Sequence, residues 1–155
     1  SPVPTETKLT IPPTSIALTK GSISAGNVNS LANNDATYLT IKSAKVNALT
    51  QTVDWNSKTQ APSRVINITI TYDGKYSTSL TQKLYIYDYT ANAWTQIDSR
   101  TVSTQDTKIT WSTLTPAKYI SSLSEISLRT YASKTTSSQF TCYADYASFT
   151  ITYTA

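Results

Sequence analysis

The sequence predicts an all-β protein, folded as an antiparallel β-sandwich of about eight or nine strands. The chain contains 29 Thr and 21 Ser, about a third of its 155 residues, together with 11 Tyr. Thr and Tyr suit the pleated surface of a strand, whereas Met is absent and the helix former Glu is scarce. Several segments also alternate apolar and polar residues, which places successive side chains on opposite faces of a strand.

A single domain accounts for the length of the chain, which is sufficient to bury a core without disulfides. Residues 1–13 hold four of the six prolines, together with Thr, Glu and Lys. Proline-rich polar sequence favours an extended, semi-rigid conformation. We therefore expect a Pro/Thr-rich linker over residues 1–13 and a β-sandwich domain over residues 14–155.

The first half of the domain contains four predicted strands. They cover residues 15–19, 38–41, 53–55 and 65–72. Residues 20–34 are rich in Gly, Ser and Asn and are predicted to form a loop. In the clearest strand Ile66, Ile68 and Ile70 share one face, and the Asp-Gly-Lys sequence at residues 73–75 is predicted to end it with a turn.

The second half begins with a predicted β-hairpin within residues 83–102. Its first strand alternates Leu84 and Ile86 with three tyrosines, residues 90–93 turn the chain, and Trp94 begins the return strand. Later strands are predicted near residues 108–111, 125–131 and 146–153, with one helical turn near residues 115–120. The predicted core contains Leu84, Ile86, Ile66, Ile68, Ile70, Ile126, Leu128, Phe149 and Ile151.

The tyrosines of the hairpin have two interpretations. In the first, the tyrosines are covered, either as a wall of the core or beneath a loop. In the second, Leu84 and Ile86 point into the core, and alternation places the tyrosines in an exposed row on the outer face. An exposed aromatic row is typical of an interaction surface, and the apolar C–H faces of sugars stack on such rings. Trp94 either caps the core or extends the row, and a neighbouring strand is expected to add basic and aromatic companions. The candidate ligand-binding residues are Lys83, Tyr85, Tyr87, Tyr89, Trp94, Arg129 and Tyr131.

The composition argues against several functional classes. The chain has no histidine, which excludes Ser-His-Asp and Cys-His catalysis, and most aspartates lie in or beside turns. We therefore do not expect an enzyme. The net charge of +4 is scattered, which argues against nucleic-acid binding, and no apolar run approaches the length of a membrane span. Cys142 has no disulfide partner within the chain and is expected to be a small buried side chain.

A series of short motifs runs through the domain between residues 15 and 154. Its residues are Asn34, Asp35, Tyr38, Leu39, Asp54, Trp55, Thr71, Tyr72, Gly74, Lys75, Thr81, Gln82, Leu84, Ile86, Tyr89, Trp94, Gln96, Ile97, Asp98, Ser99 and Arg100. Their order resembles that of jelly-roll β-sandwich domains appended to secreted bacterial enzymes, which look like carbohydrate-binding modules. The resemblance implies a jelly-roll fold, an extracellular location, and covalent linkage to catalytic or surface domains of a larger protein.

A second, shorter resemblance concerns calcium. Residues 144–149 look like the last strand of calcium-containing jelly-roll modules, in which an aspartate precedes an aromatic residue, and this implies Asp145 as a ligand. The polar Asn-Asn-Asp loop adds Asp35 as a second candidate, because calcium accepts carboxylate oxygens. The alternative is that both aspartates are ordinary turn and strand-edge residues. A structural Ca²⁺ ion is thus an expectation.

The function expected from these observations is non-catalytic binding of polysaccharide. The domain would hold a larger secreted protein on its substrate through the exposed aromatic face. The alternative is a structural or adhesive β-sandwich module of a bacterial cell-surface or extracellular protein with no glycan site. A Thr-rich sandwich behind a Pro/Thr linker fits this alternative too.

Overall fold

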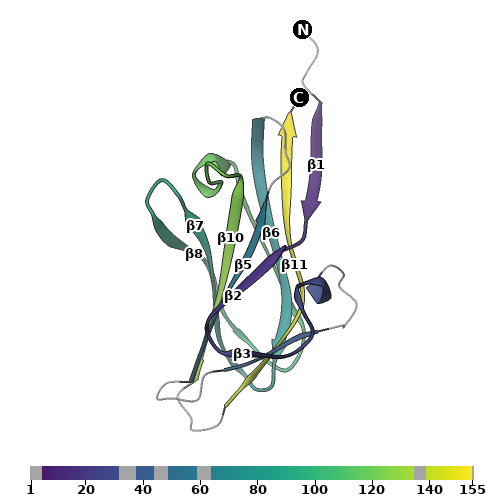
Figure 1. Cartoon of the computed structure of the whole chain (residues 1–155), viewed down its shortest axis with the longest axis vertical. Coiled ribbons are helices and arrows are strands. Elements are labelled where there is room, and N and C mark those ends of the chain that lie inside the picture. The colour runs from purple at the N-terminus through teal and green to yellow at the C-terminus, as the bar shows by residue number, and fades with distance from the viewer. Residues whose placement is uncertain (1–4, 32–37, 44–48, 59–63, 135–138, 155) are drawn as a thin grey trace.

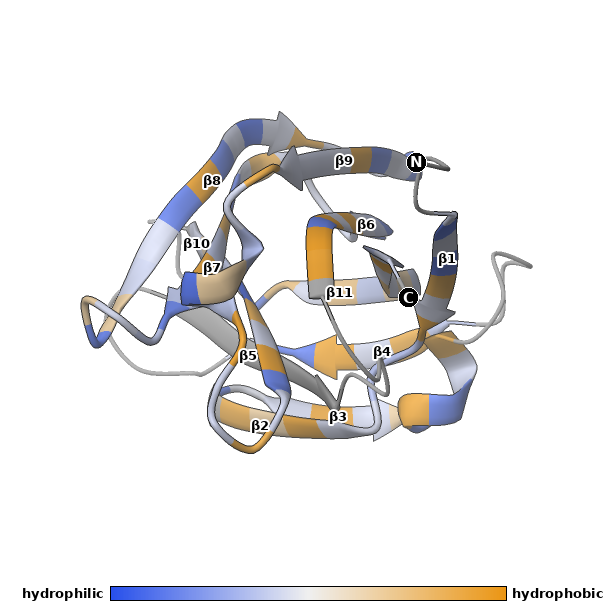
Figure 2. Ribbon diagram, turned by 90° about the horizontal axis from the view of Figure 1, so that it is seen from above, coloured by the Kyte–Doolittle hydropathy of each residue, from blue (hydrophilic) through white to orange (hydrophobic). Residues whose placement is uncertain are grey.

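Two antiparallel β-sheets pack face to face in the computed structural model of the protein (Figure 1). The structure describes residues 5–31, 38–43, 49–58, 64–134 and 139–154. Viewed from above, β8 and β9 follow one another along one edge of the sandwich, where the chain passes from one sheet to the other (Figure 2). The prediction of an all-β antiparallel sandwich is confirmed.

One sheet has six strands and the other has five. The six-stranded sheet has the order β3-β4-β11-β6-β9, and β1 pairs with β11. Its strands are β1 (Glu6–Ile11), β3 (Ser22–Ala25), β4 (Leu39–Lys42), β6 (Arg64–Tyr76), β9 (Thr107–Thr113) and β11 (Thr141–Thr154). The five-stranded sheet has the order β2-β5-β10-β7-β8. Its strands are β2 (Ser15–Lys20), β5 (Leu49–Lys58), β10 (Glu125–Lys134), β7 (Leu80–Asp88) and β8 (Ala93–Val102).

Two short 3₁₀ helices, η1 (Val28–Leu31) and η2 (Pro116–Tyr119), complete the described elements. The helical turn near residues 115–120 is therefore confirmed. Eleven strands are described instead of eight or nine, because β1 falls in the predicted linker and β3 in the predicted loop. Both are short, largely exposed strands, so neither shows the clear alternation of a strand that covers a core.

The linker predicted over residues 1–13 is too long. Strand β1 pairs with β11 from Glu6 opposite Thr154 to Ile11 opposite Phe149, and Ile11 belongs to the core. The polar residues of β1 are exposed, so the segment has the composition of a linker. The sandwich therefore includes Glu6–Ile11.

The turn predicted at residues 73–75 is also wrong, because β6 continues to Tyr76. Gly74 pairs with Ala144 on one side and with Thr107 on the other. A Cβ atom at this position would lie 2.9 Å from the carbonyl oxygen of Tyr143. The glycine therefore permits close approach of two strands and does not mark a turn.

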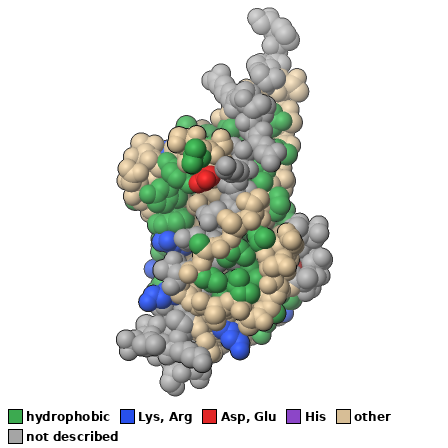
Figure 3. Space-filling view, viewed as in Figure 1, with side chains coloured by type: hydrophobic (Ala, Val, Ile, Leu, Met, Phe, Trp, Pro, Cys, Tyr) green, Lys and Arg blue, Asp and Glu red, His purple; other side chains and the backbone are tan. Residues whose placement is uncertain are grey.

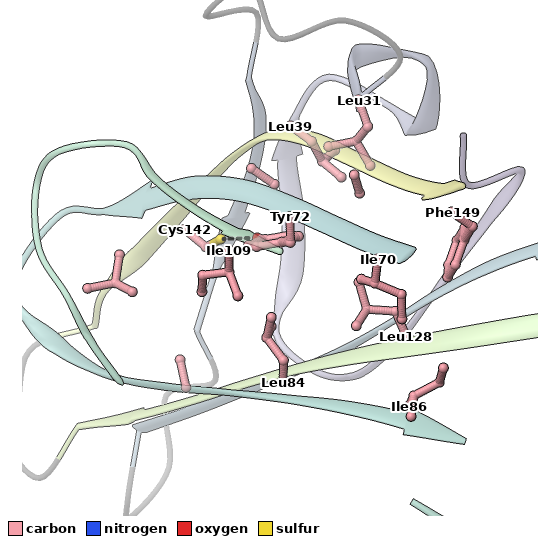
Figure 4. Close-up of a cluster of buried hydrophobic side chains, with 14 of the residues drawn as sticks. Leu31, Leu39, Ile70, Tyr72, Leu84, Ile86, Ile109, Leu128, Cys142 and Phe149 are labelled. Atoms are coloured by element: carbon pink, nitrogen blue, oxygen red, sulfur yellow. Dashed lines mark hydrogen bonds between the residues drawn. The ribbon is translucent and has the colours of Figure 1, made fainter. Parts of the chain in front are cut away.

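The core lies between the sheets, and Figure 4 shows side chains from both sheets pointing into it. Tyr72 and Cys142 lie there together, with 3.7 Å between the Tyr72 hydroxyl oxygen and the Cys142 sulfur (Figure 4). Burial raises the pKa of the Cys142 thiol to about 12, so this cysteine is the buried, unreactive side chain that was expected. The predicted core residues that are buried are Leu84, Ile86, Ile68, Ile70, Ile126, Leu128, Phe149 and Ile151.

Ile66 is the one predicted core residue that is not buried. The register between β6 and β11 shifts here, so that Asn67 pairs with Thr152 and Val65 pairs with Tyr153. The extra residue in β6 forms a bulge, and after a bulge the side chains change faces. Val65 therefore packs against the core, while Ile66 lines a pocket on the outer surface.

Candidate functional site

The tyrosines of β7 lie on the outer face of the five-stranded sheet. Along this strand Leu84 and Ile86 are fully buried, whereas Tyr85 and Tyr87 between them are only partly buried. Alternation along the strand fixes this orientation, since successive side chains leave opposite faces. The hairpin tyrosines are thus not a wall between the two sheets.

Residues on the two neighbouring strands extend this surface. In β10, Arg129 lies opposite Tyr85 and Tyr131 lies opposite Lys83. In β8, Trp94 lies opposite Tyr87, and residues directly opposite one another share a face of the sheet. The surface, which we call the aromatic face, consists of Lys83, Tyr85, Tyr87, Tyr89, Trp94, Arg129 and Tyr131.

A pocket of about 280 Å³ opens on the aromatic face. The described residues that line it are Tyr85, Trp94, Arg129 and Tyr131, which come from three adjacent strands. Figure 3 shows hydrophobic side chains gathered at the level of the β7–β8 hairpin, with basic side chains further down the same edge. Four of the seven predicted ligand-binding residues therefore surround one hollow.

Arg129 and Trp94 are in direct contact across β7. The guanidinium carbon of Arg129 lies 4.1 Å from the centroid of the Trp94 ring, a cation–π arrangement. Trp94 therefore belongs to the aromatic face and does not cap the core. The contact holds both side chains in place at one wall of the pocket, because each restricts the rotamers of the other.

The remaining members of the aromatic face lie beside the pocket. The ring of Tyr87 packs edge-to-face with Tyr89, at a centroid distance of 4.8 Å, and with Trp94 at 5.1 Å. The Tyr89 N–H donates to the Lys118 carbonyl oxygen of η2 at 2.7 Å, which fixes the end of β7. Lys83, opposite Tyr131, is likewise absent from the described lining.

The turn between β7 and β8 is fixed by the buried Asp88. Its carboxylate oxygen Oδ1 accepts hydrogen bonds from the N–H groups of Thr90 and Ala91, at 2.9 and 3.0 Å. Asn92 adopts a φ of 53°, in the left-handed region that asparagine tolerates. This turn determines where the return strand begins and so positions Trp94 against Tyr87.

The other two tryptophans are placed differently. Trp111 packs against the core and lies edge-to-face with Tyr119, with ring centroids 5.8 Å apart. Trp55 lies in β5, opposite Leu128 of β10 in the register, and its side chain falls outside the described part of the chain.

The calcium candidates are only partly within the described residues. Asp145 is 1% exposed at a bulge in β11, and Asp73 of the adjacent β6 is 6% exposed. Asp35 lies outside the described residues. Within the described ranges, no group of three or more His, Cys, Asp or Glu side chains could hold a metal. The two buried carboxylates suit calcium chemically, but the ion takes six to eight oxygens, so further oxygen donors would be required.

Sequence reasoning missed a second aromatic cluster, on the six-stranded sheet. The Lys75 ammonium nitrogen lies 4.7 Å from the ring centroid of Tyr38 and 5.7 Å from that of Tyr143. The Tyr38 hydroxyl donates to Asp106 at 2.8 Å; this bond, with burial and nearby carboxylates, raises the pKa of Tyr38 to about 12. In the sequence, the alternation around Tyr143 is a sign that its ring lies on an outer face, whereas the Asp-Gly-Lys sequence predicts a turn at Lys75.

Comparisons with known proteins identify the fold. No family model matches the sequence, and no curated protein matches it. A solved CBM4 structure is 13% identical, with a TM-score of 0.54, over 84% of this chain and 92% of that chain. The TmCBM61 structure in complex with β-1,4-galactotriose is 8% identical, with a TM-score of 0.51, over 91% and 88%. An exo-β-agarase is 9% identical, with a TM-score of 0.55, over 88% of this chain but 24% of the enzyme.

At these identities the likeness concerns the fold alone. The chain has the jelly-roll β-sandwich fold of carbohydrate-binding modules, as the sequence resemblance implied. No helix in the described ranges combines the length and hydropathy needed to cross a membrane.

Proposed function

We propose that the protein is a non-catalytic carbohydrate-binding module that binds polysaccharide outside the cell through its aromatic face. The observation that carries this proposal is the pocket in which Tyr85, Trp94, Arg129 and Tyr131 meet. The fold supports it, since solved structures with the same fold are carbohydrate-binding modules and one of them holds β-1,4-galactotriose.

The chemistry of the pocket suits a sugar. Aromatic rings offer apolar faces on which the C–H side of a pyranose ring stacks, and this stacking removes apolar surface from water. Arg129 brings a guanidinium with five N–H donors, and the hydroxyls of Tyr85 and Tyr131 both donate and accept. Glycoside hydrolysis uses two carboxylates, and the described lining residues include no carboxylate.

The proposed role is to hold a larger secreted protein on its polysaccharide. The similarity to a domain-sized part of an exo-β-agarase is consistent with such an arrangement. The alternative is a structural or adhesive module without a glycan site. The two roles differ in one property, which is whether the isolated chain binds glycans through the aromatic face.

The test is affinity electrophoresis against soluble glucans, galactans, xylans and agarose, with pull-down on insoluble cellulose and chitin. Trp94→Ala removes the pocket wall that holds Arg129 in place and should weaken binding by about 30-fold or more, a loss of roughly 2 kcal/mol. Thr150→Ala, on the other sheet, is the matched control and should bind as the parent does. Absence of binding to every polysaccharide would favour the structural alternative, and full binding by Trp94→Ala would place the site elsewhere.

We further propose that a structural calcium ion binds at Asp145, with Asp35 as a second ligand. Asp145 in β11 lies next to Tyr146, which pairs with Asp73 of β6, so two carboxylates occupy neighbouring positions on adjacent strands, and carboxylate oxygens are ligands that calcium prefers. A bound ion would supply positive charge and link β11 to the segments around it, and its role would be stability rather than chemistry.

A further inference from the structure

We infer that the aromatic face recognises one sugar residue, at a chain end or a branch, and not a run of residues along a polysaccharide. This inference rests on the proposed glycan binding and concerns its substrate class. It follows from three features of the face: the size of the pocket, the angles between the rings, and the position of Arg129.

The pocket is small for a ligand site. Its volume of about 280 Å³ lies just below the range of roughly 300–1,000 Å³ typical of pockets that enclose drug-sized ligands. The pocket that the described residues enclose is therefore suited to one ring with its substituents. A site for several consecutive sugars needs either a longer cleft or a flat platform beyond the pocket.

The rings beside the pocket do not form such a platform. A linear glycan that stacks on several rings needs ring faces that are open and turned toward the glycan chain. The planes of Tyr87 and Tyr89 meet at 65°, and those of Tyr87 and Trp94 at 80°. These three rings pack against one another and do not offer one continuous stacking surface.

Arg129 further limits the stacking surface. Its guanidinium lies over the Trp94 ring, 4.1 Å from the centroid, so a sugar cannot stack on that side of the indole without displacing it. The rings of Tyr85 and Tyr131 then remain as stacking surfaces within the pocket, beside the donors of Arg129. A terminal sugar matches this arrangement, because it carries one more free hydroxyl than an internal residue and continues in only one direction.

A glycan array tests the inference with the wild-type chain. The probes are glucose, galactose, xylose, mannose and N-acetylglucosamine, each as a monosaccharide and as β-linked oligomers up to the hexasaccharide. Isothermal titration calorimetry then measures affinity along each series that binds. We expect affinity to change by less than about threefold from the disaccharide to the hexasaccharide, since added residues leave the pocket and make few contacts.

A rise of more than about tenfold over the same lengths would overturn the inference while leaving glycan binding intact. Binding to none of the probes would instead count against the proposed function, and the inference would fail with it. The two failures are therefore distinguishable.

Two substitutions locate the contacts. Tyr131→Ala removes a pocket wall and should weaken binding by about tenfold or more. Tyr89→Ala changes a ring beside the pocket, so any effect on affinity should be the same for the disaccharide and the hexasaccharide, with a melting temperature recorded for each variant. If Tyr89→Ala weakens the hexasaccharide but not the disaccharide, the ligand runs along the strand and the inference is wrong.

Discussion

On the outer face of the five-stranded sheet, β7, β8 and β10 present partly exposed rings, whereas a row across the six-stranded sheet consists of hydroxyls. This row, which we call the hydroxyl face, contains Thr10, Thr150, Thr69 and Ser112, opposite one another on β1, β11, β6 and β9. Both faces belong to strands whose other side packs into the same core. The difference between them therefore lies in side-chain chemistry and not in backbone geometry.

The side chains of the hydroxyl face form hydrogen bonds with one another. Thr10 and Thr150 share a hydrogen bond of 3.1 Å, and Thr69 and Ser112 share one of 2.8 Å. Exchanging these hydrogen bonds for bonds to a ligand would change the free energy only a little. The rings of the aromatic face retain apolar surface that only a ligand would remove from water. We take this contrast as the physical reason for placing ligand binding on the five-stranded sheet.

The largest effect is expected where the two sheets meet. Phe149→Ala empties a fully buried core site and should lower the free energy of unfolding by about 3–5 kcal/mol. Tyr85→Ala should lower it by less than about 1 kcal/mol, because the ring lies on the outer face. Urea unfolding followed by circular dichroism measures both. Equal losses would show that the tyrosine row is part of a packed layer and not an exposed surface.

Calcium is expected to act on stability and not on the aromatic face. If Asp145 binds the ion, calcium at about 100 times its dissociation constant stabilises the fold by roughly 2.7 kcal/mol. Adding EDTA should then lower the melting temperature by roughly 5–10 °C, and Asp145→Asn should abolish this response. Differential scanning fluorimetry with and without added calcium measures it. An unchanged melting temperature, with no metal found by mass spectrometry of the native protein, would refute the site.

A smaller effect concerns alkaline pH at the second aromatic cluster. The pKa of Tyr38 is raised to about 12, chiefly by its hydrogen bond to Asp106, whereas an unfolded tyrosine titrates near 10. The folded state thus favours the neutral phenol. The resulting contribution of Tyr38 to stability is complete below about pH 10 and disappears as the pH rises to about 12. Tyr38→Phe should consequently lose less stability than the parent between these pH values. Urea midpoints at pH 8, 10 and 11.5 measure the difference, and parallel losses in both proteins would contradict the assignment.

The smallest effect is expected on the hydroxyl face. Thr10→Val combined with Thr150→Val removes both partners of one hydrogen bond and should change the free energy of unfolding by less than about 1 kcal/mol. Glycan affinity should stay at the parental value. A loss of affinity in this double variant, measured by calorimetry, would mean that the hydroxyl face contributes to binding.

Much of the aromatic face was predictable from alternation alone. Leu84 and Ile86 fixed the direction of the tyrosines, and the same period in β10 placed Arg129 and Tyr131 on the same side. The angles between rings and the contact of Arg129 with Trp94 were not predictable, because they depend on rotamers set by three strands together.

The errors in the fold have local causes. Ile66 was misplaced because a bulge changes the face of a strand without a mark in the hydrophobic pattern. Gly74 resembles a turn residue in the sequence, but a glycine is required there because the backbone of Tyr143, on a strand distant in sequence, approaches closely. Strand β1 was missed because its exposed polar residues gave it the composition of a linker. In each case the missing information was how the strand pairs with its neighbours.

Glycan binding at the aromatic face can be tested by an NMR titration that shows which face of the protein a glycan contacts. Uniformly ¹⁵N-labelled protein is titrated with the oligosaccharides of glucose and galactose, and amide and indole N–H shifts are followed. We expect the largest changes at the indole of Trp94 and at the amides of Tyr85, Arg129 and Tyr131, while Thr69 and Thr150 remain unchanged. Changes concentrated on Thr69 and Thr150 instead, with the Trp94 indole unmoved, would contradict it.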